Sequence, residues 1–339
     1  MDPSNDIGQM RMKFIASLRR KGDRGSTFHI AVESMKFLRN LVVYGKYENS
    51  SELLSLLDEQ STPVIAVNPS EFCIRNAFWL VQKLIREENL KIHGGDDSIS
   101  QYDSITKFWN KSEEHGAAAA KKFKRGLMEA VKEVVLEMET SRDSIAAQAG
   151  ELVQSHDCLI CLSLRDSPTL NAFLLVARKK KHRVLAISDV DEFDTCPENV
   201  SPIRLTDIAT KVVEATKVVL SGIAVFPDGS CFVPAGGLQL ALAAQRHAIP
   251  VYVLAAFYKI TPMFVPDPQV LNPSLPPKIP FSQSRSISGR LQLHNPAFDL
   301  LPAHLVALYV TNSAAIVPAH VYRLIGDYYH PEDIACNNN

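Results

Sequence analysis

Residues 293–312 read LHNPAFDLLPAHLVALYVTN, and residues 229–244 read GSCFVPAGGLQLALAA. These two stretches decide the fold. The first closes with an apolar run at 305–311 that predicts a buried strand. The second leads into residues 235–247, where apolar side chains recur at helical spacing and predict an amphipathic helix. Strands and helices of this kind alternate in α/β domains.

The same alternation extends from about residue 146 to residue 335. Further apolar runs predict strands at 158–164, 184–188, 200–205, 218–226 and 251–255, and amphipathic segments predict helices at 169–181, 207–216 and 319–329. Because the predicted strands are apolar along almost their whole length, both faces of the sheet must be covered. We therefore expect a Rossmann-like α/β domain at 146–335, with a mostly parallel sheet covered by helices on both faces.

Residues 1–145 predict a separate N-terminal helical bundle. Apolar residues recur there at helical spacing in three segments, for example at Phe37, Leu38 and Leu41. A proline-rich loop is expected at about 261–281 in the α/β half, where seven prolines fall within 19 residues. That density excludes both a helix and a central strand.

Composition limits the classes of partner. The chain of 339 residues carries 36 Lys and Arg against 37 Asp and Glu, so it offers no basic field to a nucleic-acid backbone. We expect no signal peptide at its start, and it has no apolar run of the roughly 18 residues that span a membrane. Its six cysteines are then expected to be reduced. These features predict a cytosolic protein with protein or small-molecule partners, without direct nucleic-acid or membrane contact.

Two patterns that suggest metal or cofactor chemistry are incomplete. Cys158 and Cys161 have the spacing of a zinc or redox pair, but no second pair completes a zinc site, and residues three apart in a strand face opposite sides. The turn at 164–168 lacks the glycines of a dinucleotide-binding loop. We therefore expect no bound metal and no cofactor.

Several segments resemble one family of proteins. They are 144–149 (SIAAQA), 167–174 (SPTLNAFL), 238–247 (LQLALAAQRH), 295–299 (NPAFD) and 322–333 (YRLIGDYYHPED). In order and spacing they resemble the alpha, beta and delta regulatory subunits of eukaryotic translation initiation factor 2B, which are related to ribose-phosphate isomerases. The Tyr-His-Pro-Glu-Asp tail favours a beta-type subunit.

The resemblance also indicates where an isomerase site would lie. The related enzymes carry a cysteine after the first strand, an acid in a Gly-Ala-Asp segment and an Asn-Lys pair. The acid position falls on Ile223, and the pair falls on Val233 and Pro234. Ile223 cannot move a proton and Pro234 offers no charge, so catalytic residues are not expected. The phosphate-binding turn of the enzymes falls on residues 165–167, close to Cys161.

The resemblance implies a non-catalytic regulatory subunit of the guanine nucleotide exchange factor for initiation factor 2. Its implied partners are the alpha, gamma, delta and epsilon subunits, in a two-fold decamer, and the alpha subunit of initiation factor 2, phosphorylated or not. Expected subunit-interface residues are Asn171, Phe173, Phe298, Tyr322 and Arg323; expected substrate contacts are Lys121, Lys122, Lys124 and Glu133. A sugar-phosphate isomerase with a rearranged site and a metabolite-binding sensor remain the alternatives. The structural alternative for Phe173 and Phe298 is that they are ordinary core residues. For the lysines, it is that they form a solvated helix face.

Overall fold

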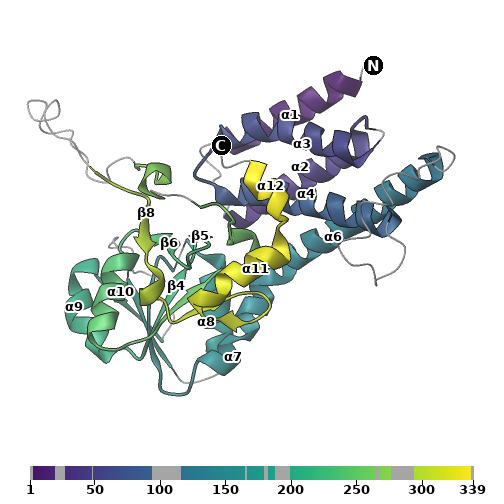
Figure 1. Ribbon diagram of the computed structural model, residues 1–339. Helices are drawn as coiled ribbons and strands as arrows, with labels where there is room; N and C mark the ends of the chain where they lie inside the picture. Colours follow the sequence, from purple (N-terminus) through teal and green to yellow (C-terminus); the bar gives the residue numbers. More distant parts are fainter. Residues whose placement is uncertain are drawn as a thin grey trace, which may run out of the picture. The chain divides into compact units, whose positions relative to one another are not determined.

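A computed structural model of the chain describes residues 3–19, 27–47, 49–93, 116–164, 166–178, 182–187, 199–264, 268–275 and 294–336. These residues form two compact units. One unit contains the described residues up to Glu139 together with those from Gly326 onward, and the other extends from Thr140 to Ile325 (Figure 1). Each unit is described by itself below.

The first unit is built from helices. They are α1 (Pro3–Arg19), α2 (Thr27–Tyr44), α3 (Ser50–Ile65), α4 (Phe72–His93), most of α6 (Gly116–Ala147) and α12 (Pro331–Cys336). The predicted apolar stripe of α2 is confirmed, because Phe37, Leu38 and Leu41 are buried. α3 begins at an Asn49 cap, whose side chain accepts the backbone N–H of Glu52 at 2.9 Å. The helical N-terminal region is present as expected.

The second unit contains the predicted sheet. In the described residues its strands are β1 (Cys158–Leu162), β2 (Arg183–Ile187), β3 (Val200–Ile203), β4 (Lys217–Ser221), β7 (Val251–Leu254), β9 (Leu308–Val310) and β10 (Ala315–Ile316). They form one sheet in the order β10-β9-β7-β4-β1-β2-β3. Every neighbouring pair is parallel except β9 and β10, so the predicted mostly parallel sheet is confirmed.

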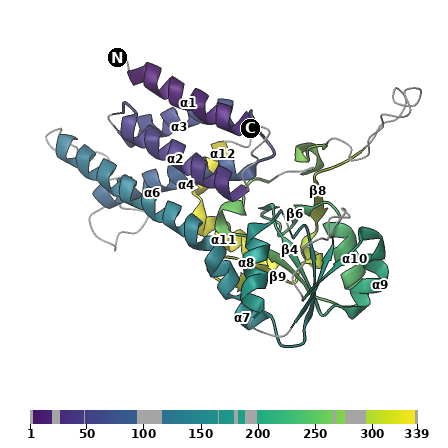
Figure 2. The same ribbon diagram turned by 180° about the vertical axis from the view of Figure 1, so that it is seen from behind.

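Helices cover both faces of this sheet. α7 (Ala149–Leu152) and α8 (Pro168–Ala177) lie on one side, whereas α9 (Ile208–Lys211) and α10 (Gly237–Arg246) lie on the other (Figures 1 and 2). α11 (Val321–Tyr328) begins in this unit, and its residues from Gly326 onward belong to the helical unit. The interior strand β1 is buried along its whole length, as a strand covered on both faces requires.

A second, smaller sheet was not predicted. β5 (Ala224–Val225), β6 (Cys231–Pro234) and β8 (Phe298–Leu301) pair antiparallel in the order β5-β6-β8. The predicted strand at 218–226 is therefore wrong as one element, because it divides into β4 and β5. The chain leaves the large sheet at Gly222, where a Cβ atom would lie 3.0 Å from the Val253 side chain.

The predicted division at 1–145 and 146–335 places the C-terminal end in the α/β domain. In the structure this end belongs to the helical unit, because α12 packs on α4. Of the predicted proline-rich loop, the structure describes 261–264 and 268–275. The second segment contains a 3-10 turn, η5 (Pro268–Leu271), and one bridge between Ser274 and Pro296. None of the helices in the described residues is long and apolar enough to cross a membrane.

Candidate functional site

The order of the large sheet reverses between β1 and β4, and α/β proteins bind ligands at the carboxyl ends of strands at such a point. In the turn after β1, Ser163 adopts the left-handed region with a φ of 52°. The Ser167 hydroxyl accepts the N–H of Leu170 at 3.2 Å, and the Asn171 side chain donates to the Leu164 carbonyl at 2.8 Å. These polar groups hold the turn and the start of α8. Residue 165, part of the predicted phosphate turn, lies outside the described residues.

The segment after β4 carries no titratable group at the expected acid position. Ile223 is half-buried, and its N–H donates to the Phe232 carbonyl at 2.8 Å. Beside it, the Lys259 ammonium is buried and donates to the Gly222 carbonyl at 2.7 Å. Lys259 was missed in the sequence because it lies in no recognisable motif. Its contact with a backbone oxygen gives it a structural role in holding the β4–β5 turn.

A carboxylate of the chain itself occupies the N-terminus of α10. One oxygen of Asp299 accepts the N–H of Gly236 at 2.8 Å and that of Leu238 at 3.1 Å. Helix N-termini with such unpaired N–H groups are where phosphates bind in many proteins. Here the donors face Asp299, while Val233 is buried and Pro234 pairs with β8. The arrangement fastens α10 to the small sheet and leaves these two N–H groups engaged.

The buried cysteines are poor nucleophiles. Burial raises the pKa of the Cys161 thiol to about 12 and also raises that of Cys158. Burial likewise raises the pKa of Cys231 to about 12. A reactive cysteine needs a thiolate at neutral pH, so these thiols are suited to packing rather than to attack on a substrate. No cluster of three potential metal ligands occurs within the described ranges.

The five predicted interface residues have different environments. Phe173 is fully buried in α8, whereas Phe298 is half-buried with its ring centroid 5.8 Å from that of Phe232. Asn171 is also half-buried. Tyr322 is 73% exposed on α11, and its neighbour Arg323 is exposed as well. Tyr322 and Arg323 are therefore the exposed members of the set.

α8 has an exposed apolar face that was not predicted from the sequence. Pro168 and Leu175 are exposed on this helix, and Ala172 and Val176 are half-exposed. Leu175 alone has 60% of its surface accessible. Eight of the ten residues of α8 are apolar, so part of its apolar surface faces solvent. The outer face of α8 is therefore an accessible apolar surface.

The predicted substrate-contact residues lie along α6, in the helical unit. Lys121, Lys122 and Glu133 are exposed. Lys124 instead donates to the Val43 carbonyl at 2.6 Å, and its ammonium lies 5.7 Å from the centroid of the Tyr47 ring. Lys124 thus joins α6 to the end of α2.

Comparison with known proteins identifies the family. A sequence model of the initiation factor 2 subunit family matches residues 23–318. The chain belongs to this family. It is 24% identical over 373 aligned positions to the translation initiation factor eIF2B subunit beta of Dictyostelium discoideum, and the alignment covers 95% of each chain. The sequence-based resemblance to these factors is confirmed.

Solved structures of this initiation factor family share the fold. The crystal structure of eIF2B beta from Chaetomium thermophilum superposes with a TM-score of 0.74 at 21% identity, covering 98% of this chain and 94% of that one. A tetrameric eIF2B beta2-delta2 complex from the same organism gives a TM-score of 0.71 at 19% identity, covering 97% and 96%.

A shorter similarity links the chain to enzymes. It is 27% identical over 111 residues to a methylthioribose-1-phosphate isomerase of Picosynechococcus sp. PCC 7002, an alignment covering 32% of each protein. This similarity agrees with the predicted relation to sugar-phosphate isomerases.

Proposed function

We propose that this chain is a beta-type regulatory subunit of the exchange factor for translation initiation factor 2, acting in the cytosol without catalysis of its own. The observation that carries the proposal is the similarity to an eIF2B beta subunit across 95% of both chains. The chain scaffolds the complex and helps to position the substrate, so that assembly geometry controls exchange.

The absence of catalysis is supported by the chemistry at the sheet edge. Ile223 offers no proton-transfer group where the isomerases carry an acid. Pro234 offers no charge, and Asp299 places a negative carboxylate at the helix N-terminus where a phosphate would otherwise bind. The high pKa of the buried Cys161 thiol also argues against covalent chemistry.

The outer face of α8 supports docking of another subunit on the α/β unit. A delta subunit is the proposed occupant, because a related beta subunit was crystallised in a beta2-delta2 tetramer. Leu175 supplies an exposed apolar side chain at this face, and we place Tyr322 and Arg323 of α11 at or near the same interface. The gamma, epsilon and alpha subunits complete the proposed decamer.

Co-purification with a delta subunit tests this interface. Leu175→Glu places a charge on the apolar face, and we expect it to abolish co-purification. Leu242→Glu is the matched control, because Leu242 is 50% exposed on α10, across the large sheet. Retention of delta by both variants would contradict the proposed interface, and purification of the wild-type chain as a lone species would contradict the proposed function.

The exposed charges of α6 are the proposed contact with the alpha subunit of initiation factor 2. Phosphorylation of that subunit adds negative charge, which changes its interaction with basic side chains such as Lys121 and Lys122. This contact is the proposed route by which the complex senses phosphorylation in the integrated stress response. Charge reversal at Lys121 and Lys122 should weaken binding of initiation factor 2 without removing delta. Unchanged binding would refute the assignment.

The short similarity to an isomerase supports a second candidate function, in sugar-phosphate binding or isomerisation. An enzyme or metabolite sensor of that superfamily would bind a sugar phosphate at the edge formed by β1 and β4. Calorimetry with ribose 1-phosphate, together with an isomerase assay on the purified chain, distinguishes the two proposals. We expect neither binding nor turnover; either result would favour the second candidate.

A further inference from the structure

One side of α4 contacts the C-terminal end of the chain. Trp79, Lys83 and Arg86 stand at helical spacings of four and three residues, so they share one face of the helix. The Trp79 ring meets that of Tyr329 edge-to-face, with centroids 6.3 Å apart, and both residues are buried. The Lys83 ammonium donates to the Asp327 carbonyl in the last turn of α11, where a positive charge is favourable.

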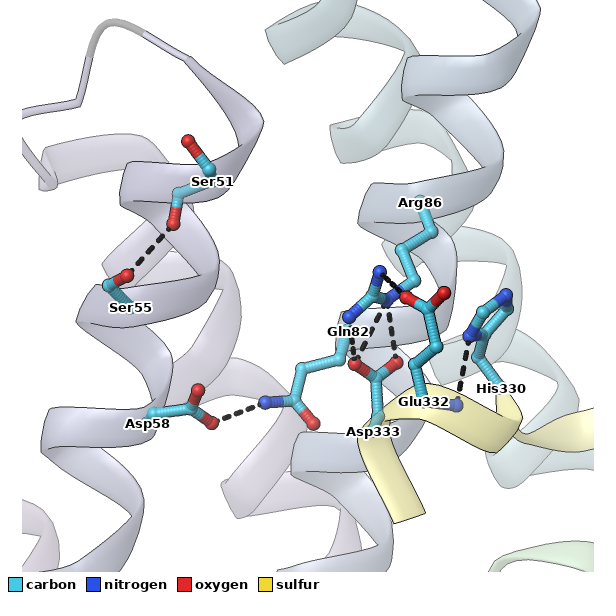
Figure 3. Close-up of polar contacts among 8 residues, drawn as sticks. All are labelled: Ser51, Ser55, Asp58, Gln82, Arg86, His330, Glu332 and Asp333. Atoms are coloured by element: carbon cyan, nitrogen blue, oxygen red, sulfur yellow. Dashed lines mark hydrogen bonds and ion pairs between the residues drawn. The ribbon is translucent and has the colours of Figure 1, made fainter. Parts of the chain in front are cut away.

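Arg86 makes the most extensive polar contact of this face (Figure 3). Its Nε and Nη2 donate to the Asp333 carboxylate at 2.9 and 2.7 Å, and its Nη1 donates to Glu332 at 2.5 Å. The Asp333 side chain is 4% exposed, whereas that of Glu332 is 67% exposed. A guanidinium fork paired with a buried carboxylate is the strong, geometrically specific form of ion pair.

A second carboxylate, Asp58, interacts electrostatically with both members of this ion pair. Asp58 of α3 accepts the amide of Gln82 at 2.6 Å, beside Arg86 and Asp333 (Figure 3). Burial raises the pKa of Asp58 most; the Gln82 hydrogen bond lowers this pKa, the charge of Asp333 raises it, and the charge of Arg86 lowers it. Asp58 is thus repelled by Asp333 and attracted by Arg86.

The docked segment cannot be expected to stay helical alone. α12 contains six residues, far fewer than an isolated helix needs in water. It begins at Pro331, after a turn in which His330 Nδ1 accepts the N–H of Glu332 at 3.3 Å. Its helical form thus depends on its contacts with α4.

We propose that residues 327–336 form a strap that opens and closes on α4 as one unit, with the Arg86–Asp333 pair as its latch. Opening uncovers the Trp79 side of α4 and leaves the rest of the helical unit folded. This proposal does not depend on the function proposed above, because it concerns only contacts within the helical unit.

Hydrogen exchange of the full-length wild-type chain is the first test. The amides of the strap should exchange at least tenfold faster than the protected amides of α4 around Leu80 and Val81, through a local opening. Equal rates in the strap and in α4 would overturn the proposal, because the two would then open only together.

Charge variants test the latch. Arg86→Glu should accelerate exchange of the strap at least tenfold beyond the wild type and change the emission of Trp79, read in a Trp109→Phe background. The double variant Arg86→Glu/Asp333→Arg should restore most of the protection. Arg125→Glu is the matched control, since Arg125 is 84% exposed and pairs only with Glu129 among the ion pairs of the described residues.

Two outcomes of the variant experiment would overturn the latch. The strap of Arg86→Glu could exchange at the same rate as that of the Arg125→Glu control, which would mean that the Arg86–Asp333 pair does not stabilise the docked strap. Alternatively, α4 could lose its protection together with the strap, which would make residues 327–336 an inseparable part of the core.

Discussion

Removal of the Asp299 carboxylate should loosen α10 by an amount that the structure allows us to estimate. Asp299→Ala leaves the N–H groups of Gly236 and Leu238 without their acceptor at the helix N-terminus. Loss of a capping side chain costs about 1 kcal/mol. Loss of a negative charge at the positive end of a helix costs about 0.5–1 kcal/mol at a partly exposed site. The expected total is about 1.5–2 kcal/mol.

Hydrogen exchange of α10 in the full-length chain is the assay, because it reports local opening separately from the helical unit. A loss of about 1.5–2 kcal/mol corresponds to exchange roughly 10–30-fold faster. Asp299→Asn keeps an acceptor oxygen without the charge and should show about half the effect in kcal/mol. Phosphate at about 10 mM should stabilise Asp299→Ala by about 1.4 kcal/mol if it binds with a Kd of about 1 mM, and should leave the wild type unchanged.

Two results would refute this reasoning. Exchange in Asp299→Ala within about twofold of the wild type would mean that the carboxylate contributes little to the helix start. Equal stabilisation of wild type and Asp299→Ala by phosphate would mean that Asp299 does not occupy the anion-binding position. The second result would also strengthen the case for a sugar-phosphate ligand.

Two further predictions concern packing and thiol chemistry. Gly237→Ala should destabilise the α/β unit by about 1–3 kcal/mol in thermal unfolding, because a Cβ atom would lie 2.5 Å from the Val233 side chain. The control Gly150→Ala, where a Cβ atom would meet nothing within 4 Å, should stabilise the unit by up to about 1 kcal/mol. The reverse order of stabilities would contradict the packing around Gly237. Cys161 and Cys231 should resist alkylation in the native chain and react after denaturation. Burial raises the folded-state pKa of both thiols from 9.0 to about 12. Their contribution to the free energy of unfolding is therefore fully present below about pH 9 and is lost between pH 9 and 12. Thiol labelling that rises sharply in the native chain near pH 8–9 would show that the thiols are accessible.

Much of the large sheet could be predicted because its strands are short apolar runs that need cover on both faces. The small sheet could not. β6 ends in Pro234, β8 contains Asp299, and β5 is two residues long, so none has the pattern of an independent strand. At Gly222 the backbone lies close to the Val253 side chain of β7, and local sequence does not reveal such an approach.

The candidate site shows the same limit. The resemblance to the isomerases placed Ile223 and Pro234 at positions of catalytic residues, and their side-chain chemistry can be read from the sequence. The sequence could not show that Phe173 is buried while Leu175 is exposed, because a mostly apolar helix does not indicate which side is covered. Contacts between distant residues were also beyond it, such as Lys124 with Val43 and Arg86 with Asp333.

The measurement that tests the central claim most directly is the native mass of the complex recovered with this chain from cytosol, with each component identified. The account predicts alpha, gamma, delta and epsilon subunits in equal copy number with this chain, at the mass of a two-fold decamer. Recovery of the chain as a homodimer without these subunits would contradict the assignment as a regulatory subunit.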